Sequence, residues 1–364
     1  MEGAKTKKML CLGGVVVAVQ VLASLSGSQY YLTQLTMAAY YGLVVIGLAA
    51  VMGYAGQISI GHAGFFAIGG YISAAMTTSN LMPGLEQSQT AFLLHRLGFL
   101  MQAQDMYGET LLVFTPWAAG VTAVSVAALV AFFLGIPVLK LKGHYLAMAT
   151  LGFGTIVYRL VLATPLFGEA DGISEVPAFP LLPAFGSLPP VMVSGDGTLR
   201  IVNYYIAWVL LMAGMLLLLN LLDSRVGRAL RALHTSEEAA ESSGINTARC
   251  KLSVFVISAV YASLAGVFLT HYNGGIGPSE ASVMKSVRYV ALVAVGGMTN
   301  LWGALLAGVV LTFLSLRGVF GSYDDAVFGL ILIGVMLFAP KGMLDLRALF
   351  LPAGKKEPKG EGTH

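Results

Sequence analysis

The chain is a series of long apolar stretches separated by short polar segments. Ten of these stretches reach or approach the roughly 20 mostly apolar residues that a membrane-spanning helix needs. They cover residues 9–26, 32–53, 58–78, 116–139, 145–164, 204–222, 252–271, 284–297, 303–316 and 326–340. The pattern predicts an all-α polytopic membrane protein with about ten transmembrane helices, some of them short or broken.

The ninth segment depends on a split in the stretch 289–316, which can also be read as one helix. Its centre carries Gly296 and Gly297 followed by Thr299 and Asn300, which is a turn signal. Charge supports the split, because an unsplit helix would place the basic C-terminal region outside, against the positive-inside rule. With ten segments and a cytoplasmic N-terminus, 15 of the 21 Lys and Arg residues are cytoplasmic: Lys5, Lys7, Lys8, Lys140, Lys142, Arg225, Arg228, Arg231, Arg249, Lys251, Lys341, Arg347, Lys355, Lys356 and Lys359.

Composition excludes a soluble globular domain. Of the 364 residues, 57% are hydrophobic and 11% charged, where soluble domains carry about 25% charged residues. The 44 glycines suit membrane helices, because small residues let helix backbones approach closely. The only cysteines, Cys11 and Cys250, support neither a disulfide framework nor a metal site.

Three regions are expected along the chain. Residues 1–8 form a cytoplasmic N-terminus, 9–340 a transmembrane domain, and 341–364 a cytoplasmic and partly disordered tail. The basic start followed by an apolar run resembles a signal peptide, but no small-x-small cleavage site precedes Tyr30, so a retained helix is expected. The long loops 80–115 and 165–203 are expected outside, where they can receive a partner.

The loop 223–251 is the most informative cytoplasmic segment. Thr235 stands three residues before Glu238, which is a capping-box pattern, and Gly244 is a natural helix stop. A helix of two turns gains little from its own hydrogen bonds and needs something to pack against it. A cytoplasmic partner would provide this support. The alternative is an ordinary solvated loop whose arginines extend along the membrane surface.

Four motifs carry a resemblance to a known family. Residues 227–233 read GRALRAL and 238–246 read EAAESSGIN, and together they resemble the coupling loop of permease subunits of ABC importers. Residues 53–71, GYAGQISIGHAGFFAIGGY, are similar to the glycine-rich third helix of the branched-chain amino acid permeases in that class. Residues 141–154, LKGHYLAMATLGFG, and 296–308, GGMTNLWGALLAG, match the same family, most closely its longer permease.

The resemblance implies a set of partners. These are a second homologous permease, two ATPase subunits that bind ATP and Mg²⁺, and an extracytoplasmic substrate-binding protein, with membrane lipid around the bundle and no nucleic acid. No cofactor is expected on this chain itself. The residues expected to couple it to the ATPases are Gly227, Arg228, Arg231, Thr235, Glu237, Glu238, Ala239, Ala240 and Gly244.

A translocation path is expected along the glycine-rich third segment, where the backbone can open locally and present carbonyl groups to water. Its candidate residues are Gln57, Ser59, Gly61, His62, Gly64, Phe65, Gly152 and Gly154. For His62, an interior histidine bonded across helices is favoured over a substrate contact. The glycines suit close packing as well as they suit transport.

No acidic residue falls clearly inside a predicted span, so an uncharged path is expected and a proton relay is not supported. Arg159 lies close enough to a helix end for its guanidinium to reach the membrane surface. The chain has no Walker A motif, nucleophile elbow or His-Glu-x-x-His helix, which argues against an enzyme.

The sequence therefore predicts a permease subunit in the bacterial plasma membrane. It would translocate branched-chain or other neutral amino acids by alternating access, driven by separate ATPase subunits. A urea or short-amide permease of the same class, a secondary carrier without an ATPase, and a structural or signalling membrane protein remain as alternatives.

Overall fold

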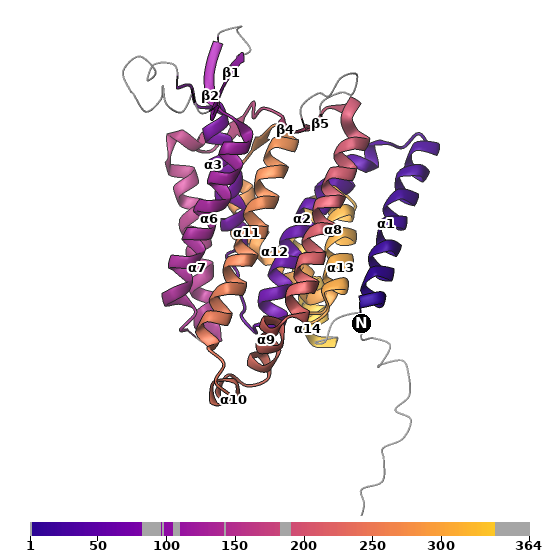
Figure 1. The fold of residues 1–364 in the computed structure, drawn as a ribbon. Helices are drawn as coiled ribbons and strands as arrows, with labels where there is room; N and C mark the ends of the chain where they lie inside the picture. Colours follow the sequence, from indigo (N-terminus) through magenta and orange to yellow (C-terminus); the bar gives the residue numbers. More distant parts are fainter. Residues whose placement is uncertain are drawn as a thin grey trace, which may run out of the picture.

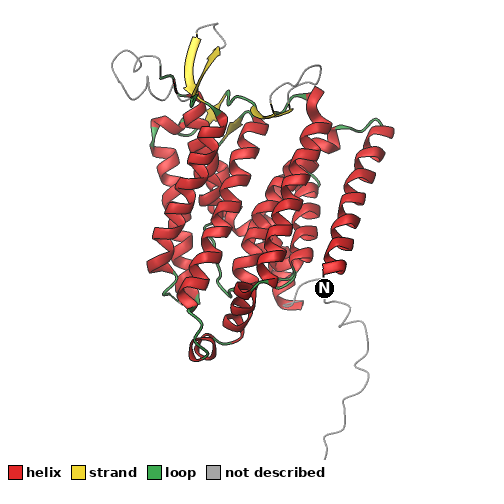
Figure 2. Ribbon diagram, in the orientation of Figure 1, coloured by secondary structure: helices red, strands yellow, loops and turns green. Residues whose placement is uncertain are grey.

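The computed structural model describes residues 2–81, 96, 98–104, 110–141, 143–182 and 191–338. These residues form a bundle of roughly parallel and antiparallel α-helices (Figures 1 and 2). The twelve described helices are α1 Glu2–Leu25, α2 Tyr30–Tyr54, α3 His62–Thr78, α6 Pro116–Val138, α7 His144–Ala163, α8 Arg200–Asp223, α9 Arg225–Thr235, α10 Glu237–Ser242, α11 Thr247–Asn273, α12 Val283–Gly296, α13 Leu301–Leu316 and α14 Asp324–Phe338.

Ten of these helices match the ten predicted apolar segments. Among the described residues, α1, α2, α6, α7, α8 and α11 are long and apolar enough to cross a membrane. The other four, α3, α12, α13 and α14, have 14 to 17 residues. The predicted split is confirmed, because Gly297 has a φ of 92° and ends α12. The tail 341–364 lies outside the described residues.

The predicted start of the third segment is wrong by four residues. Residues 58–61 are not helical, and α3 begins at His62. The non-helical linker between α2 and α3 therefore covers residues 55–61. The hydropathy of residues 58–61 does not predict their non-helical structure, because isoleucine and serine occur in buried loops as well as in helices.

The described residues include six short strands. Strands gather at one end of the bundle, here called the hairpin end (Figure 2). They form three antiparallel pairs: β1 Leu100–Gln104 with β2 Thr110–Phe114, β3 Ile173–Ser174 with β6 Gly275–Ile276, and β4 Phe179–Leu182 with β5 Val191–Val193. Five of the six lie in the two loops predicted to be external. Helices α9 and α10 lie at the opposite end, here called the α10 end (Figure 1).

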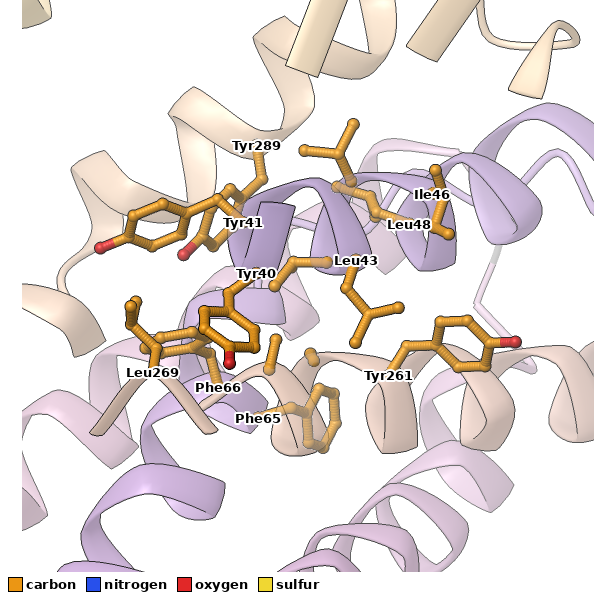
Figure 3. Packing of buried hydrophobic residues seen from close by; sticks show 14 of the residues in the cluster. Tyr40, Tyr41, Leu43, Ile46, Leu48, Phe65, Phe66, Tyr261, Leu269 and Tyr289 are labelled. Carbon is orange, nitrogen blue, oxygen red and sulfur yellow. The ribbon is translucent and has the colours of Figure 1, made fainter. Parts of the chain in front are cut away.

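The core is built around α2, α3 and α11. Helix α2 is buried along nearly all of its apolar length, and α11 makes its most extensive contacts with α3. Phe65 and Phe66 of α3 pack beneath Tyr40 and Leu43 of α2 (Figure 3). The outer surfaces of α6, α7 and α14 instead expose large apolar side chains such as Phe133, as expected where helices meet lipid.

Helices α3 and α11 meet along a close contact that we call the α3–α11 seam. A Cβ atom added to Gly69 would lie 2.2 Å from the Ser263 carbonyl oxygen, and one added to Gly266 would lie 2.1 Å from that of Phe66. Two hydrogen bonds cross the seam between side chains. His62 bonds to Ser258 at 2.7 Å, and Ser73 bonds to His271 at 2.8 Å.

Candidate functional site

A sharp corner joins α8 to α9 at the α10 end. A Cβ atom on Gly227 would lie 2.0 Å from the Leu222 carbonyl oxygen, so only glycine fits there. Arg231 donates to the Leu222 carbonyl at 2.9 Å and Arg228 to that of Asp223 at 3.3 Å. Cationic donors at carbonyls that end a helix are favourable. Three of the predicted coupling residues thus hold the corner from within the chain.

Helix α9 is amphipathic and lies against the bundle with its apolar face. Gly227, Leu230 and Leu233 are buried, whereas Arg228, Arg231 and His234 are exposed. Our sequence analysis did not predict this helix. Its buried residues recur at every third position, close to the helical repeat, but the segment is too short and too basic for hydropathy to reveal it.

Helix α10 has the predicted stop but a different start. Its N-cap is Ser236, whose hydroxyl accepts from the Ala239 amide at 3.3 Å. Thr235, the predicted cap, is the last residue of α9 and bonds to the Arg231 carbonyl at 3.1 Å. Thr235 and Ser236 are adjacent, and either side chain could cap α10. Because Thr235 belongs to α9, Ser236 occupies the cap position. Gly244 has a φ of +80° and ends the helix as predicted.

One face of α10 is attached to the start of α11. The Glu237 carboxylate lies 2.5 Å from the Lys251 ammonium, and the Thr247 hydroxyl donates to Glu241 at 2.6 Å. Ala240 is buried between these contacts. The opposite face is free in this chain: the predicted coupling residues Glu238, Ala239 and Gly244 are exposed. Helix α10 is therefore held to its own chain on one side and open on the other.

Most of the predicted path residues form close packing between α3 and α7. A Cβ atom on Gly61 would lie 2.4 Å from the Thr150 carbonyl oxygen, and one on Gly64 would lie 3.1 Å from the Phe153 ring. Gly154 faces the same contact. Phe65 is fully buried against Phe153, with ring centroids 4.7 Å apart.

Gly152 is not brought together with these residues. It has open space around it, on another side of α7. His62 is buried and hydrogen-bonds to Ser59 at 2.9 Å and Ser258 at 2.7 Å. Both ring nitrogens therefore have partners, in agreement with the predicted interior histidine.

Gln57 differs from the other predicted path residues. Its side chain is 3% exposed, and neither its amide nitrogen nor its amide oxygen has a hydrogen-bond partner. It lines a pocket of about 180 Å³ together with His234, Glu237 and Lys251. This pocket lies between the α2–α3 linker and the contact of α10 with α11. Gln57, a predicted path residue, and Glu237, a predicted coupling residue, therefore line the same pocket.

A separate polar cluster lies between α2 and α12. Glu280, in the 3₁₀ turn Pro278–Ala281, lies 2.8 Å from the Lys285 ammonium and accepts from the Tyr41 hydroxyl at 3.0 Å. Lys285 also lies over the Tyr41 ring, 4.6 Å from its centroid. Beside it, Tyr289 is buried and its hydroxyl has no partner. The sequence predicts no acidic residue at this depth.

Among the described residues, no group of three or more His, Cys, Asp and Glu side chains is arranged to hold a metal ion.

A family profile described as branched-chain amino acid transport system / permease component matches residues 30–339 of this chain. The high-affinity branched-chain amino acid transport system permease protein LivM of Salmonella typhimurium is 30% identical, over 99% of this chain and 80% of its own length. LivM of Escherichia coli is also 30% identical, and LivH of Escherichia coli is 28% identical over 86% of this chain and 96% of its own length. No solved structure matches the chain.

Proposed function

Because the chain belongs to the branched-chain amino acid transport permease family, we propose that it forms half of the membrane-spanning part of an ABC importer, which translocates branched-chain or other neutral amino acids by alternating access. The chain is a multi-pass membrane permease component and not an enzyme. In this proposal, ATP and Mg²⁺ bind to two partner ATPase subunits, and the chain converts their movement into transport.

The observation that carries the proposal is the one-sided attachment of α10. Its exposed face, which includes Glu238 and Ala239, is available to another protein, while Glu237 and Glu241 attach it to α11. A groove of about 410 Å³ adjoins it, lined by Ile136 of α6, by Leu139 directly after α6, and by the start of α11. A partner's side chains can fill this groove while its main contact is with α10.

Charge supports placing the α10 end in the cytoplasm. Lys5, Arg225, Arg228, Arg231 and Arg249 all belong to helix ends or helices on that side. Positive residues gather on the cytoplasmic side of bacterial membrane proteins. The hairpin end would then face outwards, where a substrate-binding protein delivers the substrate. A second homologous permease would form the other half of the transmembrane part.

The proposed movement passes along α11. Closure of the ATPases moves α10, and the Lys251 and Thr247 contacts carry this movement to the first turns of α11. The close seam forces α3 to follow α11 as one body. The pocket beside Gln57 changes shape as its α10 wall moves, which would open or close the inner end of the path.

Purification and uptake test this function directly. In mild detergent, the tagged chain should co-purify with two ATPases and a second permease, and proteoliposomes containing the complex should import leucine only with ATP and the binding protein. Leucine uptake driven by an ion gradient without ATPases would support a secondary carrier instead. Uptake of urea in place of leucine would support the short-amide alternative.

A further inference from the structure

The cluster of Glu280, Lys285 and Tyr41 lies well inside the bundle. Tyr41 is near the middle of the 25-residue helix α2, about 16 Å from its start at 1.5 Å per residue. The other end of α12 reaches the α10 end, where Gly53 meets the Met298 carbonyl. With 14 residues, α12 spans about 21 Å of a hydrocarbon layer of about 30 Å. Its start, and Glu280 before it, therefore lie below the outer membrane surface.

The charged side chains of Glu280 and Lys285 require an explanation at this membrane depth. An ionisable side chain inside the membrane is costly, and such residues face the protein interior or a water-filled route and mark substrate pathways. The side chains of Glu280 and Lys285 keep 20% and 21% of their surface exposed in the single chain. Because lipid is a poor neighbour for a carboxylate, this exposed side must face water or the second permease. The pair thus borders either a water-filled route or the interface with the second permease.

The cluster also has unused hydrogen-bonding capacity. One Glu280 carboxylate oxygen, Oε2, is buried without a partner, as are the hydroxyls of Tyr71 and Tyr289. Each of the two tyrosines is 1% exposed. The Tyr289 ring lies 6.2 Å from that of Tyr41, and α3, which carries Tyr71, packs against the 3₁₀ turn that carries Glu280. Tyr41 and Tyr289 lie side by side with their hydroxyls directed the same way (Figure 3). Buried polar groups without a partner require an explanation, and a polar substrate passing through the cluster would supply one.

We propose that this cluster is a recognition site for the α-ammonium and α-carboxylate groups of a neutral amino acid during its passage, an inference that rests on the proposed function. The free oxygen of Glu280 accepts from the substrate ammonium. Lys285 and the unpaired phenols of Tyr71 and Tyr289 donate to the substrate carboxylate. The apolar side chain lies toward Phe66, whose ring is 5.9 Å from that of Tyr41.

The charge balance of the site selects the class of substrate. One carboxylate and one ammonium form a neutral pair, so a zwitterion entering between them replaces one ion pair with two and leaves no charge unmatched. An amino acid with a charged side chain, or a compound lacking either end group, would leave an unpaired charge at membrane depth, which is costly. The nearby Arg288 is already paired with Asp324 at 2.7 Å and Asp325 at 2.8 Å.

The main test removes both charges together. Replacing one member of a buried pair leaves the other unpaired, whereas replacing both by neutral groups of similar size is often harmless to folding. The double variant Glu280→Gln/Lys285→Met is therefore expected to insert into the membrane and to assemble with its partners. Its leucine uptake, measured with leucine-saturated binding protein, should fall by about tenfold or more, which corresponds to about 1.4 kcal/mol for each factor of ten.

Two buried tyrosines provide a matched control. Tyr289→Phe and Tyr40→Phe each remove one hydroxyl without a partner from a tyrosine that is 1% exposed, but Tyr40 points away from the cluster and stacks on Phe268 (Figure 3). Because only Tyr289 donates to the substrate carboxylate in the proposal, Tyr289→Phe should lower the number of leucine molecules imported per ATP by about threefold, the value of one hydrogen bond. Tyr40→Phe should leave that ratio unchanged.

The outcomes separate the two proposals. If the wild-type complex imports no leucine, the proposed function fails. If the wild type imports leucine and the double variant assembles and imports it equally well, the charges are structural and the recognition site is wrong while the function stands. Equal loss of transport in Tyr40→Phe and Tyr289→Phe would also overturn the site, because packing and not recognition would then explain the effect.

Discussion

The α3–α11 seam and the α9–α10 segment are built in opposite ways. In the seam, glycines bring two backbones within van der Waals contact, and both of the histidines that cross it have serine partners. In α10, a single buried alanine and two side-chain bonds hold six residues to α11, and the rest of the helix is exposed. The seam has no freedom to slide, whereas α10 has room for contact on its outer side.

This difference indicates separate roles in transport for the α3–α11 seam and for α10. A rigid pair of helices can carry a displacement over its whole length without losing it to local deformation. A small helix attached at one point can receive that displacement from another protein. Transport would depend on both properties, so weakening the seam and weakening the attachment should fail in distinguishable ways.

The largest expected effect comes from breaking the seam. Gly266→Val places a branched side chain where the Phe66 carbonyl oxygen would already be 2.1 Å from a Cβ atom. Because neither backbone can move away, we expect a loss of about 3 kcal/mol or more of stability, with little folded protein recovered. The yield of monodisperse protein in detergent measures this. The control Gly152→Val, in open space on α7, should be recovered normally.

A smaller and more local effect is expected at the corner before α9. Gly227→Ala forces the Leu222 carbonyl aside, at a cost of about 1–3 kcal/mol. The bundle should still fold, but α9 and α10 should shift, so that ATP hydrolysis continues without leucine uptake. Gly13→Ala, on α1 with no neighbouring atoms, should retain full coupling. Normal uptake in Gly227→Ala would show that the corner does not position α10.

The smallest effect is expected from one seam hydrogen bond. Ser258→Ala removes a partner of His62 and should destabilise the protein by about 1 kcal/mol, seen as a lower thermal midpoint. Ser253→Ala, elsewhere on α11, removes a hydroxyl that bonds only within its own helix and should not change the midpoint. If the two midpoints fall equally, the seam gains nothing from the bond between His62 and Ser258.

The sequence was most informative where a single local pattern decides the structure. Apolar length located all ten main helices, and the Gly296–Gly297 turn divided the ninth from the eighth. Gly244 was found as a helix stop, because a left-handed residue there favours glycine. These features are determined by residues that are adjacent in the sequence, so a local sequence pattern is enough to predict them.

Features that depend on distant residues were missed or misplaced. The Glu280 cluster joins residues of α2, α3 and α12 around a turn that hydropathy assigns to an outer loop. Gly61 and Gly64 remain candidates for a path, and only the fold shows that the neighbour they meet is α7. Gln57 also remains a path candidate, and nothing in its sequence context shows that its amide lacks a partner.

A photo-crosslink from α10 tests the central claim most directly. A photoreactive amino acid replaces Ala239, exposed on the free face of α10, or as a control Ala163, exposed at the hairpin end of α7. We predict that irradiation of the purified complex joins position 239 to an ATPase subunit and that position 163 gives no such product. A complex that retains its ATPases but yields no ATPase crosslink from position 239 would contradict the assignment of α10 as the docking helix.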